Sequence, residues 1–302
     1  MPSFARRTVL AVPGSSEKFI AKSRELDVDA IFLDLEDAVA PGAKRQARAL
    51  IVDALGDPAG WKAPNVTVRI NDWTTPWTTG DLTEVVSAAG EHIDAIVLPK
   101  VTSRDHVVAT DLILSQIERE TGLPQGKIGL EVQIEEPRGL LAADAIAGAS
   151  SRLVSLVFGP GDYMASIGMG TLSVGSQPDG YLADAFHHPL MTILLAARAH
   201  GLLAVDGPYV GIRDLPGFEA SARKSAALGY DGKWVVHPSQ VDSGNAIYSP
   251  NEATLARARR IVEAYDLATS RAGGVTGAIE VDSEMVDEAG VKLAQALLAK
   301  VR

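Results

Sequence analysis

The sequence contains no cysteine among its 302 residues. Disulfide bonds, thiolate metal sites and cysteine nucleophiles are therefore excluded, and the absence agrees with a reducing compartment. No run of about 18 apolar residues is present, and the first residues lack the charged start, apolar stretch and small-residue cleavage site of a signal peptide. We therefore expect a cytoplasmic protein with no membrane partner.

An excess of positive charge is also missing. The formal net charge is −10, whereas binding to nucleic acid phosphates requires a basic surface. Nucleic acid is therefore not expected as a partner, although a local cluster of lysine and arginine could still hold a small anion. With 46% hydrophobic and 22% charged residues, the composition is typical of a globular enzyme with a full core.

Short runs of β-branched and apolar residues alternate with helix-length segments such as 103–121 and 214–229. The runs that we expect to form strands are residues 8–14, 30–36, 65–71, 95–101, 127–135, 153–162, 202–210 and 232–240. Apolar strands separated by helices are typical of a parallel sheet covered on both faces. Eight of them favour an α/β fold of the (β/α)8 TIM barrel type over an open doubly wound sheet. The segment 163–188, rich in Met, Gly, Ser and Pro, is expected to form a loop over one barrel mouth.

The C-terminal part is expected to extend this barrel, which we assign to residues 1–248. Residues 249–270 are predicted to form a helix packed on the barrel, with Ser249 as N-cap and Glu252 closing a capping box. Three glycines between residues 270 and 277 predict a flexible hinge. A last helix is expected over 283–301, so we interpret residues 271–302 as a hinged C-terminal lid.

Polar residues follow almost every predicted strand, at the end where parallel barrels place their active sites. They are Glu36, Asp37, Arg69, Asn71, Lys100, Glu135, Asp162, Asp206 and His237. Carboxylates outnumber cationic groups among them, and a buried carboxylate needs a cation. We therefore predict a hard divalent cation, Mg2+ above all, held by one or two carboxylates together with substrate oxygens and water.

Glu36 and Asp37 have a structural alternative. They could form ion pairs with Lys44, Arg45 or Arg48 of the next helix, or they could lie behind the ligands of the metal ion. The residue types alone leave both interpretations open.

Other residues at the strand ends also have structural alternatives. Asp162 could be only a helix N-cap, Lys100 could belong to an ion pair at the barrel bottom, and His237 is expected to be a hydrogen-bonded structural histidine. The Pro-Gly turn and helix at 12–25 could bind a phosphate, because a helix N-terminus exposes backbone N–H groups and this helix carries three basic side chains.

Eight motifs occur in the order found in a known family. They are "LDLEDAVAPGAKRQAR", "VRINDWTTPWT", "LPKV", "VQIEEPRG", "FGPGDYMAS", "VDGPY", "GYDGKWVVHPSQV" and "SEMVDEA". Through them the chain resembles the citrate lyase beta-subunit-like family of acyl-CoA lyases, and within it the L-malyl-CoA and β-methylmalyl-CoA lyases. The resemblance runs from about residue 6 to residue 300. It implies a (β/α)8 barrel that needs Mg2+, or Mn2+ in its place. The implied reaction is reversible cleavage of a 3-hydroxyacyl-CoA to acetyl-CoA or propionyl-CoA plus glyoxylate.

The resemblance also implies roles for particular residues. The metal ligands fall on Glu135 and Asp162, and the substrate-binding arginine falls on Arg69, which we expect to face the thioester enolate. Asp287 is the implied acid/base carboxylate of the C-terminal segment. Glu36 and Asp37 are expected beside the metal ligands in the catalytic site. The implied CoA and substrate contacts are Ala11, Val12, Pro13, Gly14, Lys18, Lys22, Arg69, Gly161, Val205 and Asp206.

Several rival functions remain open from the sequence. The protein could be a citramalyl-CoA or citryl-type lyase, or a metal-dependent 2-oxoacid aldolase acting on free acids. A thioesterase side activity is a further alternative, and a CoA-binding subunit or regulator is the alternative that is not an enzyme. The resemblance implies a homotrimer or homohexamer, in which the lid of one subunit covers the barrel of its neighbour.

Overall fold

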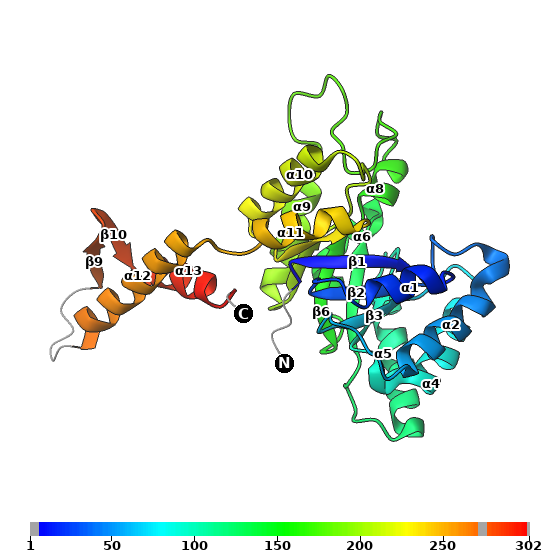
Figure 1. Ribbon diagram of the computed structural model, residues 1–302. Helices are drawn as coiled ribbons and strands as arrows, with labels where there is room; N and C mark the ends of the chain where they lie inside the picture. Colours follow the sequence, from blue (N-terminus) through cyan, green and yellow to red (C-terminus); the bar gives the residue numbers. More distant parts are fainter. Residues whose placement is uncertain (1–5, 271–276, 301–302) are drawn as a thin grey trace. The chain divides into compact units, whose positions relative to one another are not determined.

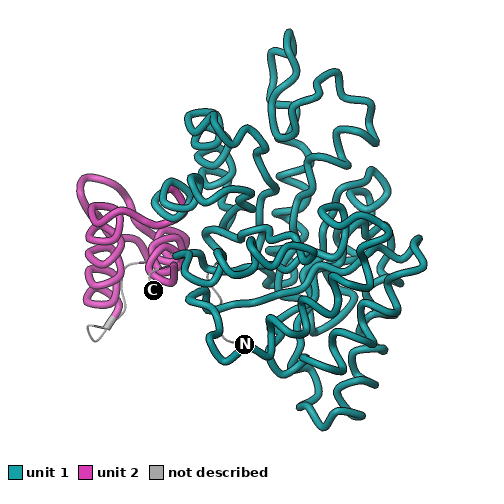
Figure 2. Tube along the Cα trace, turned by 45° about the vertical axis from the view of Figure 1, so that its right-hand side comes forward, with its two compact units in different colours: residues 1–246 teal, residues 247–302 magenta. Residues whose placement is uncertain are grey.

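The computed structural model describes residues 6–270 and 277–300. The chain divides into two compact units, residues 1–246 and residues 247–302 (Figure 2). The predicted boundary at residue 248 lies close to this division. No helix in the described ranges is long and apolar enough to cross a membrane.

The first unit contains a closed barrel of eight parallel strands, each paired with its neighbours in sequence order (Figure 1). The strands are β1 (Thr8–Pro13), β2 (Ala30–Asp34), β3 (Val66–Arg69), β4 (Ala95–Leu98), β5 (Gly129–Ile134), β6 (Leu153–Phe158), β7 (Leu203–Asp206) and β8 (Gly232–Val235). Each lies within a predicted run, and the (β/α)8 fold is confirmed. The strands are shorter than the runs, because polar residues such as Asn71, Glu135 and Asp162 lie beyond the strands, whereas Arg69 and Asp206 are the last residues of β3 and β7.

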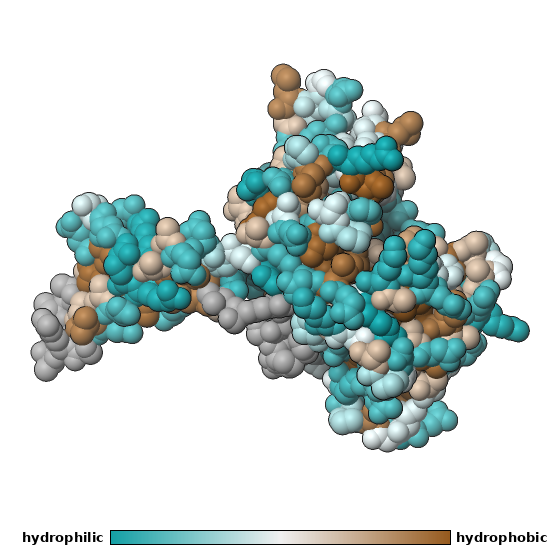
Figure 3. Space-filling view, viewed as in Figure 1, coloured by the Kyte–Doolittle hydropathy of each residue, from teal (hydrophilic) through white to brown (hydrophobic). Residues whose placement is uncertain are grey.

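Helices and single turns connect the strands. They are α1 (Glu17–Ser23), α2 (Lys44–Gly56), α3 (Thr78–Gly80), α4 (Ser87–Ala89), α5 (Arg104–Thr121), α6 (Pro137–Leu141), α7 (Ala143–Ala147), α8 (Pro160–Ser166), α9 (His187–Ala199), α10 (Leu215–Leu228) and α11 (Val241–Ile247). The 3-10 turns are η1 (Pro41–Ala43), η3 (Gly90–His92) and η4 (Pro238–Gln240), and η2 (Asp81–Val86) is a π-helix. In Figure 3, hydrophilic residues cover much of the visible outer face of this unit.

Two long helices begin and end where the sequence predicts. Ser103 accepts a hydrogen bond from the backbone N–H of Asp105 and caps α5, while Asp214 accepts from Gly217 and caps α10. Both end at left-handed glycines, Gly122 and Gly229, a common form of C-terminal cap. The predicted loop 163–188 is partly wrong, because residues 163–166 continue helix α8 and α9 begins at His187.

An apolar layer fills the middle of the barrel. It consists of Val9, Ala30, Phe32, Val97, Val157, Val205 and Trp234. Below it, Arg6 forms a buried ion pair with Glu131 of β5, 2.7 Å between Nη2 and Oε1. On β5 the apolar residues Leu130, Val132 and Ile134 alternate with polar ones and are buried. The polar residues therefore share the interior face of this strand, and the last of them reach the mouth.

The second unit contains α12 (Glu252–Ser270), the antiparallel strands β9 (Ala278–Val281) and β10 (Glu284–Asp287), and α13 (Glu288–Leu298). The predicted capping box is wrong. Asn251, not Ser249, accepts the backbone N–H of Thr254 at 2.8 Å and caps α12.

The predicted last helix is wrong over its first residues, because 284–287 form β10. Asp282 and Ser283 both have positive φ, 52° and 63°, and make the two-residue turn of a β-hairpin. α12 and α13 pack on each other within this unit. Residues 271–276 of the predicted hinge lie outside the described residues. The lid, and the packing of 249–270 on the barrel, stay predictions.

Candidate active site

A cavity of about 430 Å³ opens at the carboxyl ends of the barrel strands. Its floor includes Phe32 and Trp234 of the apolar layer, and Asp34, Gln133 and Gly159 line its polar side. Among the predicted site residues, its walls contain Ala11, Val12, Pro13, Asp37, Arg69, Glu135, Gly161 and Asp162. The structure therefore gathers residues from β1, β2, β3, β5 and β6, and from the loops that follow them, around one space.

Arg69 is fixed by Asp34, its direct partner in the register between β3 and β2. Arg69 Nε and Nη2 each donate to one Asp34 oxygen at 2.7 Å, the bidentate arrangement that orients a guanidinium most firmly. Burial would raise the pKa of Asp34, but the charge and hydrogen bonds of Arg69 and two backbone N–H donors outweigh it and hold that pKa below its ordinary value. The guanidinium rests over the rings of Phe32 and Trp234, at 5.3 and 5.6 Å.

Glu36 faces two cations at the mouth. Its Oε2 lies 2.9 Å from Arg69 Nη1, an ion pair without hydrogen-bond geometry, and its Oε1 accepts from Lys100 Nζ. Burial raises the pKa of Glu36. The positive charges of Arg69 and Lys100 oppose that rise and the charge of Asp37 adds to it, and the net shift of the pKa is upward. Lys100 is also 3.3 Å from Asp37 and 3.5 Å from Asp162. Lys100 is therefore at the mouth, and its alternative placement at the barrel bottom is wrong.

The cations of α2 do not pair with these carboxylates. Lys44 Nζ donates to the backbone carbonyls of Leu35 and Glu36, and Arg48 pairs with Asp81 and Glu84. The structural alternative for Glu36 and Asp37 is wrong as far as Lys44 and Arg48 are concerned, because those side chains are engaged elsewhere.

Glu135 follows β5, and its side chain is buried. Its Oε1 accepts the backbone N–H of Lys100 at 2.7 Å, and its Oε2 accepts Gln133 Nε2 at 2.5 Å. Burial, together with the charges of Glu36 and Asp162, raises the pKa of Glu135 to about 8. A side chain at residue 159 would displace Glu135 or the backbone, because a Cβ there would lie 2.2 Å from Glu135 Oε2.

Asp162 lies in the first turn of α8, whose N-cap position is Gly159. The N-cap alternative for Asp162 is therefore wrong. Its carboxylate is 40% exposed and lines the cavity together with Glu135. The placement of His237 agrees with its structural interpretation, because its Nδ1 is 2.8 Å from Ser239 Oγ.

The residues at the mouth fit a divalent metal ion. Five carboxylates, those of Asp34, Glu36, Asp37, Glu135 and Asp162, lie beside the cationic side chains of Arg69 and Lys100, and the nearby Lys44 donates to backbone carbonyls. Within the described ranges no group of three or more His, Cys, Asp or Glu is arranged as a complete ligand set. Mg2+, however, is usually bound by one or two carboxylates plus water and substrate oxygens. A cation beside Glu135 would oppose the negative charges that raise its pKa.

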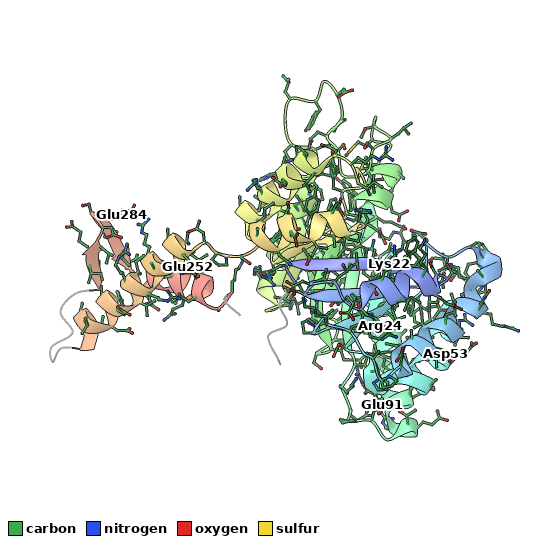
Figure 4. The ribbon with its side chains drawn as sticks, viewed as in Figure 1. Lys22, Arg24, Asp53, Glu91, Glu252 and Glu284 are labelled. Atoms are coloured by element: carbon green, nitrogen blue, oxygen red, sulfur yellow. The ribbon has the colours of Figure 1, made fainter. Side chains whose placement is uncertain are left out.

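Five of the predicted CoA contacts do not line this cavity, namely Gly14, Lys18, Lys22, Val205 and Asp206. Lys18 and Lys22 are exposed on α1, and Lys22 is labelled in Figure 4. Gly14 is buried, and its N–H donates to the carbonyl of Asp34 at 2.9 Å. The side chain of Val205 lies in the apolar layer.

Asp206 lines a different, smaller cavity of about 210 Å³, where it accepts Lys233 Nζ at 2.5 Å. Asp287 belongs to the second unit. Its carboxylate caps α13 by accepting the N–H of Gly290 at 3.1 Å. The roles assigned to Val205, Asp206 and Asp287 stay predictions.

Sequence reasoning missed Gln133 as part of the site, and it did not predict the pairing of Asp34 with Arg69. Asp34 was noticeable as a carboxylate ending an apolar strand, but its pairing with Arg69 depends on the register between strands. Gln133 occupies the interior face of β5 two residues before Glu135, a spacing that strand periodicity could have indicated.

Comparisons with known proteins agree with this fold. Residues 7–238 match the sequence profile described as HpcH/HpaI aldolase/citrate lyase. The chain is 36% identical to the L-malyl-CoA/beta-methylmalyl-CoA lyase of Cereibacter sphaeroides, over 98% of this chain and 95% of that protein. It is 34% identical to the (3S)-malyl-CoA thioesterase of the same species, over 97% and 94%.

One solved structure is protein CitE from Mycobacterium tuberculosis in complex with magnesium, acetoacetate and coenzyme A. It matches with a TM-score of 0.75 and 30% identity, and 98% of each chain is covered. A profile that spans most of the barrel and relatives that span nearly the whole chain lead to one conclusion. The chain belongs to the HpcH/HpaI aldolase/citrate lyase family and is a carbon–carbon lyase.

Proposed function

We propose that the protein cleaves a 3-hydroxyacyl-CoA with a terminal carboxylate, reversibly, to acetyl-CoA or propionyl-CoA and glyoxylate. Malyl-CoA and β-methylmalyl-CoA are the proposed substrates. The observation that carries the proposal is the meeting of Glu135, Asp162 and Arg69 around one cavity at the barrel mouth. The names of the relatives support the CoA ester as substrate.

Glu135 and Asp162 are proposed to hold a divalent ion, Mg2+ or Mn2+. When bound, such an ion supplies Lewis-acid stabilisation of negative charge on substrate oxygens. Arg69 is proposed to face the oxygen of the thioester enolate. Its orientation is set in advance by Asp34, and a preorganised cation stabilises developing charge without reorganisation.

Asp287 is proposed to move the proton. In the direction of synthesis its carboxylate takes a proton from the α-carbon of the CoA thioester. The electron pair left on that carbon forms the new bond to the aldehyde carbon of glyoxylate, and the alkoxide that results takes up a proton. Asp287 is exposed on the second unit, which is proposed to act as a lid that excludes water.

The experiment incubates the purified protein with Mg2+, glyoxylate and either acetyl-CoA or propionyl-CoA. Mass spectrometry of the CoA products should then show addition of one glyoxylate per CoA ester. A CoA pool that stays unchanged with both esters contradicts the proposal. Consumption of glyoxylate with a free acid but with neither ester would support the aldolase acting on free acids.

A thioesterase is the second candidate, because one of the relatives is a (3S)-malyl-CoA thioesterase. Hydrolysis would release free CoA from malyl-CoA with no glyoxylate, and the same mass analysis separates the two reactions. The homotrimer or homohexamer, with the lid of one subunit over its neighbour, is also a proposal, and light scattering of the purified protein tests the subunit number.

A further inference from the structure

The five carboxylates at the barrel mouth are not equally free to bind a metal ion. Asp34 accepts from Nε and Nη2 on one edge of the Arg69 guanidinium, and Glu36 faces Nη1 of Arg69 and the ammonium of Lys100. The distribution of the two cations therefore leaves some carboxylates neutralised and others in need of positive charge.

Lys100 contacts both kinds of carboxylate. Its ammonium donates to Glu36 and lies 3.3 Å from Asp37. Its backbone N–H donates to Glu135 at 2.7 Å, and its Nζ is 3.5 Å from Asp162. One residue thus contacts both predicted metal ligands and both neighbouring carboxylates.

The backbone of Lys100 makes this possible. Its φ is 51°, and it is the only non-glycine residue with positive φ in the described part of the barrel unit. The left-handed conformation costs energy for a residue with a Cβ, so the surrounding structure must hold it. The turn directs the N–H towards Glu135 while the side chain extends to Glu36 and Asp37.

We propose that Lys100 is a positioning residue that decides which carboxylates bind the divalent ion. The ammonium donates hydrogen bonds to Glu36 and Asp37 and so excludes the ion from that pair, whereas its contact with Asp162 is a longer ion pair at 3.5 Å. The backbone N–H orients Glu135 towards the ion. This inference rests on the proposed metal site at Glu135 and Asp162, and it concerns selection of the ligands rather than the reaction.

The two parts of this role can be separated by substitution. Lys100→Gly removes the ammonium but tolerates the left-handed backbone, because glycine has no Cβ. Lys100→Ala removes the ammonium but keeps the Cβ; without the hydrogen bonds to Glu36 and Asp37 that help to hold the left-handed conformation, the backbone is expected to relax and to turn the N–H away from Glu135. Lys62→Gly is the matched control, since Lys62 is an exposed lysine paired with Asp27 in the loop before β3.

The experiment counts Mn2+ ions bound per chain by electron paramagnetic resonance, with the full chain and no substrate. The native protein and Lys62→Gly should bind one ion. Lys100→Gly should bind a second ion, more weakly than the first, because Asp37 and one oxygen of Glu36 lose their ammonium partner while Glu36 keeps its ion pair with Arg69. Adding Asp37→Asn to Lys100→Gly should restore one ion. Lys100→Ala should bind at Glu135 about tenfold more weakly than Lys100→Gly.

The outcomes separate this inference from the proposed function. No Mn2+ on the native protein would overturn the metal site itself. One ion on the native protein and one ion or none on Lys100→Gly would overturn the role of the ammonium. Equal affinities of Lys100→Ala and Lys100→Gly for the first ion would overturn the role of the backbone.

Discussion

Gly159→Ala tests whether the packing behind Glu135 sets the position of its carboxylate. A Cβ at residue 159 would lie 2.2 Å from Glu135 Oε2, 2.5 Å from Glu135 Cβ and 2.9 Å from Gln133 Nε2. Ordinary contacts of such atoms begin near 3.4 Å, so either Glu135 or the backbone must move by about 1 Å. A shift of about that size at a reacting group costs on the order of 100-fold in turnover. Overpacking of this kind costs about 1–3 kcal/mol of stability.

The assay compares kcat/KM, the Mn2+ dissociation constant and the urea midpoint of Gly159→Ala with those of the native protein. Gly170→Ala is the control, because Gly170 lies in the loop that leads from α8 to α9 and a Cβ there meets nothing within 4 Å. We expect loss of turnover and of Mn2+ affinity in Gly159→Ala and neither loss in the control. Native turnover and native Mn2+ affinity in Gly159→Ala would refute the reasoning that Gly159 fixes Glu135.

Three further predictions concern charged groups. Asp34→Asn removes the bidentate partner of the buried Arg69 and leaves it only its ion pair with Glu36, so it should lower the free energy of unfolding by about 3 kcal/mol, the low end for a broken buried pair, in urea titrations at pH 7. The pKa of Asp34 is lowered in the folded state, so its stabilisation is present above the ordinary carboxyl pKa of about 3.9 and is lost as the pH falls through the folded value. The difference in free energy of unfolding between native protein and variant should therefore shrink below about pH 4. A difference that stays constant with pH would contradict this role of Asp34. Arg152→Met should cost a similar amount, because it leaves Glu118 buried and unpaired at the opposite end of the barrel, but kcat per folded molecule should not change. Asp287→Asn should lower kcat at least about 100-fold, as loss of an acid/base group does, while the Mn2+ affinity measured without substrate stays native; weaker Mn2+ binding would place Asp287 among the groups that hold the ion.

The barrel and the residues at its mouth could be predicted because they depend on local patterns. Eight apolar runs specify eight strands, and the polar residue that ends a run necessarily lies at the mouth. Arg69, Glu135 and Asp162 were recognisable in this way, and the structure places all three around one cavity.

The partners of these residues could not be predicted, because they depend on contacts between distant parts of the chain. The pairing of Asp34 with Arg69 follows from the register of β2 against β3, which neither strand specifies alone. Lys100 reaches Glu36 because its backbone is left-handed, a conformation that its residue type disfavours. The hairpin of β9 and β10 was missed because its turn residues, Asp282 and Ser283, are not the Asn-Gly or Asp-Gly pair that usually marks such turns.

The most direct test of the central claim is removal and return of the metal ion during the cleavage assay. The protein is treated with a strong chelator, and glyoxylate release from malyl-CoA is measured before and after Mg2+ is added back. We expect release to stop on chelation, to return with Mg2+, and to be absent at every Mg2+ concentration in Glu135→Gln. Undiminished release of glyoxylate by the chelated protein would contradict a metal ion at Glu135 and Asp162 as the basis of the reaction.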